Sequence, residues 1–394
     1  MKKITFLIIV LFYTFCLSAQ VYNIGHTSIT FADPARNNQS VSTQIYYPAV
    51  STGNNVAAAN GIFPYIVFAH GFMMGENAYF DLSDTLVSKG YIVIFVTTNG
   101  GISPNHEDFG ADLSFMCNQF FSLNTNSNSS SLFLGKINNK KAIVGHSMGG
   151  GSTILGAQNN TNINTIICLS PVGATTPSAI SAAHLVTIPA LIVSSSGDSV
   201  SPAHANHMPV YDSLASTCKV FMSIKGGGHC LYGNPNWACD FGESSSGSTI
   251  TITRAQQQDV TRDFITPWLN YYLKNDVSAS NVFFDSLQTS PRITYLNGCS
   301  ITTSIQEKIK NEINISYFLE NDNLTLKISN ALDNNISVQL FNLLGEIQSY
   351  SEESSFISNT GTITKTINLS GISHGMYLVR VCDKNKMNGF KFIK

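Results

Sequence analysis

Residues 142–151 read AIVGHSMGGG, an apolar run that leads into a serine among glycines. An apolar strand followed by Gly-x-Ser-x-Gly and a small-residue helix start is typical of a nucleophile elbow. In such a turn the serine backbone is strained, and Gly145 and Gly149 let the strand and the helix pass closely. A glycine-rich turn without chemical function is the alternative. The flanking strand and helix favour Ser147 as a nucleophile.

Apolar, β-rich runs alternate with longer amphipathic segments over residues 20–300, which predicts an α/β domain with a mostly parallel sheet covered by helices. The predicted strands are residues 43–47, 65–69, 91–96, 142–145, 165–169, 190–193 and 219–224. The predicted helices are residues 77–88, 107–121, 204–214 and 256–273. In the last helix, core positions recur every three or four residues at Val260, Phe264, Trp268 and Tyr271. The Ser-rich residues 242–250 are predicted to form a long loop.

After residue 300 the pattern changes to strict alternation of apolar and polar residues, as at Leu324, Leu326 and Ile328. This alternation predicts a small antiparallel β-sandwich over residues 313–394. Residues 301–312, which carry mixed charges, are the expected linker.

The first residues are predicted to be a secretory signal peptide, residues 1–19. Two lysines precede an apolar stretch that ends at Leu17-Ser18-Ala19, a small-residue cleavage site. A membrane anchor and a lipoprotein signal at Cys16 are the alternatives, but the apolar run is short for a spanning helix.

Composition narrows the class of partner. Charged residues make up 12% of the chain and the net charge is −2, so nothing attracts nucleic acid or an anionic membrane in general. We expect a neutral or apolar partner and a monomer. No Cys/His spacing or carboxylate cluster specifies a metal, and no cofactor is expected.

Export would permit disulfides among the seven cysteines other than Cys16. Cys230 and Cys239 bracket a short loop and are the favoured pair, whereas Cys168 lies in an apolar run and is expected to be a buried thiol. Spacing leaves the full connectivity open.

A nucleophilic serine needs a base and an acid that orients the base, which follow in chain order Ser, Asp, His on loops after strands. Asp198 follows the strand predicted at residues 190–193, and His229 follows the one at residues 219–224. The alternatives are a turn aspartate and a surface histidine. Four other histidines lack this position after a strand: His106, His184, His204 and His207.

Oxyanion stabilisation requires backbone N–H groups, one after the nucleophile and one after an early strand. These are predicted to be Met148 and Phe72, whose side chains would also form an apolar platform for the acyl group. His70 is expected to brace this loop by hydrogen bonding.

Several segments, in this order and spacing, resemble the bacterial cutinase and polyester hydrolase family, which includes enzymes that act on poly(ethylene terephthalate). They are HGF at 70–72, GHSMGGG at 145–151, IPALIV at 188–193, SGDSVSP at 196–202, PVYDSL at 209–214, GGGH at 226–229 and PWLNYYLKND at 267–276. The resemblance covers nearly all of residues 21–300. It implies an α/β-hydrolase core without a helical lid, and a shallow exposed cleft.

Carried onto this chain, the resemblance implies Ser147 as nucleophile, His229 as base and Asp198 as acid, with Phe72 and Met148 as oxyanion donors and substrate contacts. His146 matches the cutinase-like members and would contact substrate. Val172 stands where polyester hydrolases of the family usually have a tryptophan, which weakens stacking on an aromatic acid unit. The segment over residues 230–253 is expected to wall the cleft with Trp237, Tyr232 or Phe241.

A second resemblance lies in the tail. FNLLGE at 341–346, INLSGISHGMYLVRV at 367–381 and FKFIK at 390–394 are similar to the C-terminal sorting domain of type IX secretion in Bacteroidota. This implies the outer-membrane type IX machinery as a partner, and a secreted or cell-surface location. A carbohydrate-binding module is the rival interpretation of a small sandwich.

The resulting hypothesis is a secreted serine esterase that hydrolyses polyesters through an acyl-enzyme. An esterase for small soluble or lipid esters, of the acetylhydrolase kind, is the first alternative. A non-catalytic surface adhesion protein on a hydrolase scaffold is the second.

Overall fold

The computed structural model describes residues 21–125, 131–299, 314–320, 322–329, 336–342, 346–357, 362–383 and 386–394. The chain divides into two compact units, Met1–Ser300 and Ile301–Lys394. The predicted signal peptide at 1–19 and the linker at 301–312 lie outside the described residues.

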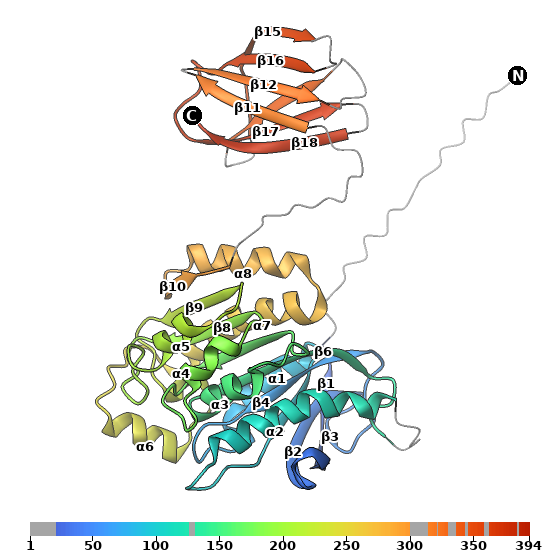
Figure 1. Cartoon of the computed structure of the whole chain (residues 1–394), viewed down its shortest axis with the longest axis vertical. Coiled ribbons are helices and arrows are strands. Elements are labelled where there is room, and N and C mark those ends of the chain that lie inside the picture. The colour runs from blue at the N-terminus through green and yellow to red at the C-terminus, as the bar shows by residue number, and fades with distance from the viewer. Residues whose placement is uncertain are drawn as a thin grey trace, which may run out of the picture. The chain divides into compact units, whose positions relative to one another are not determined.

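The first unit is built on a ten-stranded sheet with the strand order β10-β9-β8-β7-β6-β4-β5-β2-β1-β3 (Figure 1). Strands β4 to β9 are mutually parallel, and antiparallel strands flank them on both sides. The strands are β1 (Asn23–Asp33), β2 (Gln39–Ala49), β3 (Gly53–Asn54), β4 (Phe63–Ala69), β5 (Ile92–Val96), β6 (Ile137–His146), β7 (Thr165–Leu169), β8 (Ala190–Ser195), β9 (Lys219–Ile224) and β10 (Ile293–Asn297).

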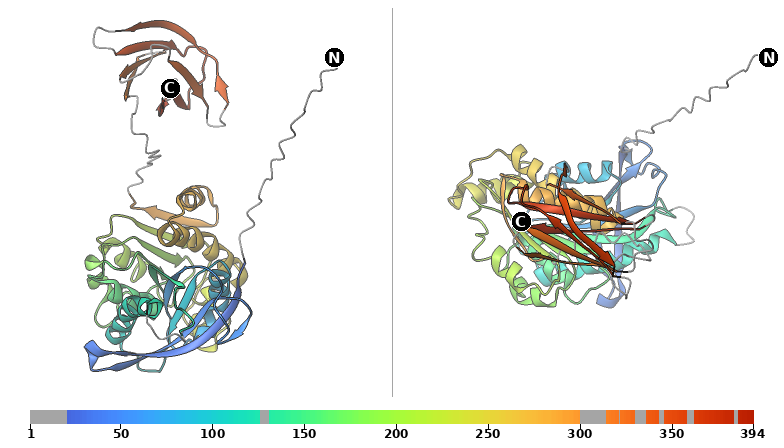
Figure 2. Two further views of the ribbon diagram at one scale, coloured as in Figure 1. Left: turned by 90° about the vertical axis from the view of Figure 1, so that its right-hand side faces the viewer. Right: turned by 90° about the horizontal axis from the view of Figure 1, so that it is seen from above.

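All seven predicted strands are confirmed within this sheet. The strands that the pattern did not predict, β1, β3 and β10, lie at or next to its edges. Most side chains of β10 face solvent, so this strand lacks the continuous apolar run of the central strands. The long pair β1 and β2 curves along one edge of the sheet, in blue (Figure 2).

Helices cover both faces of the sheet. They are α1 (Phe80–Ser88), α2 (His106–Gln119), α3 (Met148–Ala157), α4 (Ala179–Ala182), α5 (His207–Ser213), α6 (Trp237–Ser245), α7 (Arg254–Lys274) and α8 (Val277–Thr289). Short 3-10 helices are η1 (Pro34–Arg36), η2 (Glu76–Tyr79), η3 (Phe120–Asn124), η4 (Ala183–Leu185) and η5 (Cys230–Tyr232). The four predicted helices correspond to η2 with α1, α2 with η3, α5, and α7.

Two sequence predictions about helices are wrong. Residues 242–250 are not a continuous loop, because residues 242–245 form the last part of α6. This helix begins at an Asn236 cap in a segment rich in serine and glycine, whose residue types gave no helical pattern. Tyr271 is only half-buried, unlike the other three predicted core residues of α7.

The core has two layers because side chains alternate across each strand. In β6, Ile143 faces the layer that packs against α2, α3 and α5, while Val144 faces the layer that packs against α1, α7 and α8. Trp268 of α7 is buried in the second layer, and its indole N–H donates to Thr165 Oγ1 of β7 at 2.7 Å. Helix α7 is thereby fixed to the centre of the sheet.

Two disulfides are present among the described residues. The favoured pair, Cys230 and Cys239, is confirmed. The second bridge joins Cys218, just before β9, to Cys299, just after β10, and so ties the edge strand β10 to its neighbour. Cys168 is a buried free thiol, as expected.

The second unit contains two four-stranded antiparallel sheets, with the orders β11-β12-β16-β15 and β14-β13-β17-β18. Their strands are β11 (Asn314–Glu320), β12 (Asn323–Ser329), β13 (Ser337–Phe341), β14 (Ile347–Gln348), β15 (Ser351–Ile357), β16 (Ile363–Asn368), β17 (Met376–Asp383) and β18 (Lys386–Ile393). Leu326, Leu340 and Val379 belong to one shared core. The predicted all-β tail is confirmed. Over the described residues, no helix has the length and apolar character needed to cross a bilayer.

The turn between β6 and α3 is as tight as the glycine spacing predicted. Ser147 lies in it at φ 57° and ψ −121°, a conformation that a non-glycine residue rarely adopts. A Cβ on Gly149 would lie 2.3 Å from the carbonyl oxygen of Ala69, at the end of β4. The start of α3 therefore contacts the backbone of the next strand directly, which only glycine allows.

We expect Gly149→Ala to lower the free energy of unfolding of the first unit by about 3 kcal/mol or more, because rigid backbone surrounds the added methyl group. Gly242→Ala is the matched control, since a Cβ there meets nothing within 4 Å. Urea unfolding followed by tryptophan fluorescence measures both, because the two tryptophans lie in this unit at Trp237 and Trp268. Equal stability of the two variants would contradict the expectation.

Candidate active site

Three side chains from three loops meet at the carboxyl ends of the parallel strands. His229 Nε2 lies 2.8 Å from Ser147 Oγ, and His229 Nδ1 lies 2.8 Å from Asp198 Oδ2. Ser147 follows β6, Asp198 follows β8 and His229 follows β9. The structure brings together all three residues that the chain order predicted, in the contacts by which a carboxylate orients an imidazole and the imidazole accepts a hydroxyl proton.

Asp198 is held as a carboxylate. Its Oδ1 accepts hydrogen bonds from the backbone N–H groups of Val200 at 3.0 Å and Ser201 at 2.8 Å, which leaves Oδ2 to accept from His229. Burial by itself raises the pKa of Asp198, but the hydrogen bonds and the charge of His229 outweigh it and hold that pKa below its usual range. The acid is therefore ionised wherever the histidine works as a base.

Buried side chains hold the backbone around His229 in place. Glu243 of α6 accepts from the N–H groups of His229 at 2.5 Å and Cys230 at 2.9 Å. Gln257 of α7 both accepts from Gly228 N, at 2.9 Å, and donates to Gly228 O, at 2.8 Å. Sequence reasoning missed both residues, because nothing in their local sequence marks a glutamate or a glutamine as a partner of this loop.

Helix α6 is tied to the same loop in two further ways. The disulfide joins Cys239 of α6 to Cys230, the residue after His229. Arg254, at the start of α7, donates to the carbonyl oxygens of Cys230 and Gly233 and pairs with Asp240 of α6 at 2.7 Å. Residues that follow His229 in the chain, in α6 and at the start of α7, therefore hold the His229 loop in place.

The two predicted oxyanion donors lie at the start of α3 and on the loop after β4. Met148 is the first residue of α3, so its N–H has no partner within the helix. Phe72 lies on the loop after β4, and its side chain is 45% exposed. His70 is buried and its ring nitrogens lie 2.9 Å from the carbonyl oxygens of Gly71 and Thr98, which bears out the expected brace.

His146 has a different place from the one expected. Its ring is completely buried, with Nε2 2.9 Å from the carbonyl oxygen of His229 and Nδ1 3.0 Å from Tyr79 Oη. Tyr79 Oη also accepts from Gly71 N at 2.8 Å. The expectation that His146 contacts substrate is therefore corrected, because both ring nitrogens link the Phe72 loop to the His229 loop from within the protein.

The remaining predicted contact residues lie in different positions. Val172 is half-buried, and its N–H donates to the carbonyl oxygen of Ser147 at 3.0 Å. Trp237 and Phe241 are one turn apart on α6 and are 73% and 69% exposed. Tyr232 is buried, with its hydroxyl 2.8 Å from Ser195 Oγ, so it cannot wall a cleft.

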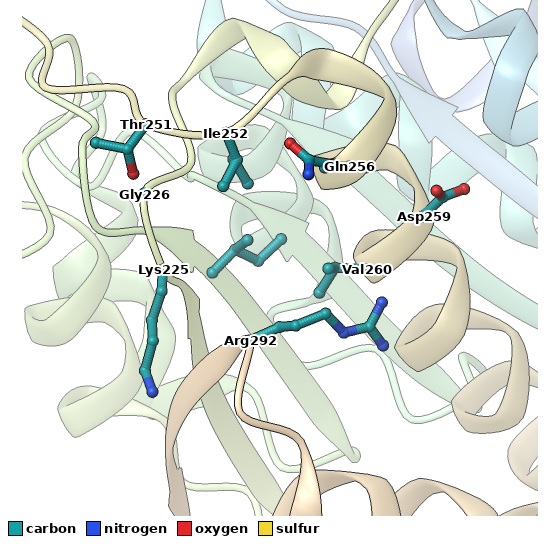
Figure 3. A pocket seen from close by; sticks show the side chains of 9 residues that line it. Lys225, Gly226, Thr251, Ile252, Gln256, Asp259, Val260 and Arg292 are labelled. Atoms are coloured by element: carbon teal, nitrogen blue, oxygen red, sulfur yellow. The ribbon is translucent and has the colours of Figure 1, made fainter.

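Two cavities lie near these loops. One of about 420 Å³ adjoins Gly226, before His229, and does not include the Ser147, Asp198 or His229 side chains (Figure 3). The other, of about 230 Å³, is lined by His70, Met73 and Gly75 of the loop after β4, among others. In the parts of the chain that the structure describes, no three His, Cys, Asp or Glu side chains are arranged to hold a metal ion.

The site contains two buried histidines whose neutral form is favoured. Burial lowers the pKa of His146 to about 3 and that of His207, the first residue of α5, to about 4. In the unfolded chain both would titrate near pH 6.5. The unfolded state therefore binds more protons than the folded state between the folded and unfolded pKa values.

We expect the free energy of unfolding of the first unit to fall as the pH drops through about 6.5 and to stop falling on this account near pH 4 to 3, by about 1 kcal/mol per pH unit for each histidine. Urea titrations at a series of pH values, read by tryptophan fluorescence, measure this slope. His146→Asn should reduce the slope, and His184→Gln, at an exposed histidine, should leave it unchanged. A stability that is constant over this pH range would contradict the expectation.

Comparison with known proteins agrees with this geometry. Residues 24–286 match the family model described as PET hydrolase-like. Cutinase 1 of Thermobifida cellulosilytica and a cutinase of Thermobifida fusca are each 29% identical over 203 residues, which is 49% of this chain and 66% and 58% of those proteins. A bis(hydroxyethyl) terephthalate hydrolase of Streptomyces coelicolor is 26% identical over 192 residues, 47% of this chain and 54% of that protein. The chain thus spans less than two thirds of the length of these relatives.

The tail matches a second family model, a secretion system C-terminal sorting domain, over residues 320–394. Both resemblances that the sequence indicated are confirmed, and the sorting domain supports the expected extracellular or cell-surface location. Because the first match covers more than half of the chain and includes the strand ends that carry Ser147, Asp198 and His229, the chain belongs to the PET hydrolase-like family.

Proposed function

We propose that this protein is a secreted serine esterase that hydrolyses the carboxylic ester bonds of polyesters. The observation that carries the proposal is the continuous pair of 2.8 Å contacts from Ser147 through His229 to Asp198, in a chain of the PET hydrolase-like family. Each role in an acyl transfer has a residue positioned for it, and no cofactor is required.

In the proposed reaction, His229 Nε2 takes the proton of Ser147 Oγ as that oxygen attacks the ester carbonyl carbon. The oxyanion that forms accepts hydrogen bonds from the N–H groups of Phe72 and Met148. His229 then protonates the departing alcohol and leaves an acyl-serine. Water, deprotonated by the same imidazole, releases the acid and restores the serine.

Apolar side chains near the site support a water-poor polymer as the substrate. Phe72, Trp237 and Phe241 are 45%, 73% and 69% exposed, whereas large aromatic side chains are mostly buried in proteins. The charged fraction of 12% also means that few charged groups would have to lose water against a neutral polymer. Val172 offers less stacking surface to an aromatic acid than a tryptophan would, so we infer that aliphatic polyesters are cleaved faster than aromatic ones.

The tail supports export as part of this function. We propose that the outer-membrane type IX machinery recognises residues 313–394 and that the hydrolase unit acts outside the cell, where insoluble polymers are found. The sorting-domain match over residues 320–394 supports this partner over a carbohydrate.

We expect Ser147→Ala to lower kcat on a short p-nitrophenyl ester by about a million-fold, since the nucleophile is lost. Ser199→Ala, at a half-buried serine beside Asp198, is the matched control and should retain activity. A fluorophosphonate should label the unmodified protein and the control but not Ser147→Ala. Equal ester hydrolysis by the unmodified protein and Ser147→Ala would overturn the proposal and favour an adhesion protein on a hydrolase scaffold.

Polyester films test the substrate class. We expect the full chain to release soluble acid from an aliphatic polyester film, and less from a poly(ethylene terephthalate) film. Trp237→Ala should lower release from the aliphatic film about fivefold, because a large apolar contact with the polymer is lost. Val277→Ala, at an exposed apolar residue of α8, is the control. If neither film yields soluble product while the short ester is cleaved, the substrate is a small soluble or lipid ester instead.

A further inference from the structure

A second histidine lies beside the carboxylate of Asp198, and the reaction as described does not use it. His207, the first residue of α5, has a completely buried side chain. Its Nε2 lies 3.8 Å from Asp198 Oδ2, the same oxygen that accepts from His229 Nδ1 at 2.8 Å. Its Nδ1 lies 2.8 Å from Ser194 Oγ of β8. Nε2 has no hydrogen-bond partner among the described residues.

The neighbours of this ring select one of its two neutral tautomers. If Nδ1 carried the proton, the lone pair of Nε2 would face the negative Asp198 oxygen in a buried contact, which is repulsive. If Ser194 donates its hydroxyl proton to Nδ1, the ring proton is on Nε2 and faces the carboxylate. The second arrangement satisfies Nδ1 and places a positive N–H end against a negative charge.

The ring acts as a dipole and not as a cation. The ionisable groups that interact with it are Asp198, which favours the protonated ring, and His229 and His146, which disfavour it in that form. Burial is the largest influence and lowers the pKa of His207 to about 4. The ring is therefore neutral at the pH at which a histidine base operates.

A distance of 3.8 Å is too long for a hydrogen bond but short for an electrostatic contact in a buried site. His207 therefore stabilises Asp198 Oδ2 without displacing the hydrogen bond from His229. An apolar side chain would fill the same space without leaving a buried ring nitrogen unpaired, so packing alone does not account for a histidine at this position.

We propose that His207 is a positioning residue for the catalytic triad, which acts through Asp198. As the Nε2–H tautomer selected by Ser194, it stabilises the ionised carboxylate oxygen that orients His229. The kinetic part of this inference rests on the proposed esterase function, whereas the tautomer does not.

Nuclear magnetic resonance of the full chain, labelled with ¹⁵N in histidine, tests the tautomer without any substrate. His207→Gln assigns the signal by its loss. We expect the ring nitrogen shifts of His207 to report a neutral ring protonated at Nε2 at neutral pH. A ring protonated at Nδ1, or a doubly protonated ring, would overturn the proposal even if no esterase activity were found.

Ester kinetics test the consequence in three full-length variants. His207→Leu removes the Nε2–H dipole and should lower kcat about fivefold while KM changes by less than about twofold, because an interaction that orients the base is lost and not one with substrate. His207→Gln offers an amide N–H in place of the ring N–H and should recover most of kcat. His204→Leu, at an exposed histidine of the same segment, is the matched control and should behave like the unmodified protein.

The inference is overturned if His207→Leu has the kcat of the unmodified protein, or if His207→Gln is as slow as His207→Leu. If His207→Leu does not fold, the tautomer of His207 and the kcat of His207→Gln still test the inference. Failure of the proposed function itself would be recognised differently, as an absence of Ser147-dependent ester hydrolysis in the unmodified protein.

Discussion

The close approach of α3 to the end of β4 is the constraint on which the rest of the site depends. Gly149 allows the first turn of the helix to touch the backbone carbonyls of Ala69 and His70, where any Cβ would collide. This contact brings the start of α3 beside the loop that carries Phe72, so that the two expected oxyanion donors come from adjacent segments. Ser147, the proposed nucleophile, lies in the same turn at a positive φ.

The backbone around His229 is held in place in a different way. Ser147 is positioned by the tight turn between β6 and α3, whereas His229 lies in a glycine-rich loop that has little conformational preference of its own. Buried polar groups supply the missing order: Glu243 and Gln257 bind the backbone from one direction and His146 binds it from another. Each of these groups has its hydrogen-bond partner in the loop, so a misplaced loop would leave buried polar atoms unpaired.

The polar contacts below the surface join the separate parts of the site into one network. Gly71 N donates to Tyr79, whose hydroxyl contacts His146, which in turn contacts the His229 carbonyl. His207 adds a contact at the Asp198 end, and its protonation is opposed by burial. These side chains are buried, and they hold in place the residues that we propose act on substrate.

Much of the fold and the triad followed from local pattern. Parallel strands buried on both faces require continuous apolar runs, so β4 to β9 could be found, and residues after their carboxyl ends must share one edge. The strands β1 and β10 and the helices α6 and α8 could not be found in this way, because polar and apolar types are mixed along them and none carries a continuous apolar run.

Ser147, Asp198 and His229 could be proposed as a triad from the sequence by itself, because the members of such a triad follow strand ends in a defined order and chain order survives folding unchanged. The roles of His146, Glu243, Gln257 and His207 depended on tertiary contacts. Apart from Asp198, which lies nine residues before His207, each partner lies 13 to 83 residues away along the chain, as for His207 with Ser194 and His146 with the His229 carbonyl. No periodicity extends over such distances, and whether a polar side chain reaches solvent, substrate or a buried backbone group depends on the packing of the sheet and its helices around it.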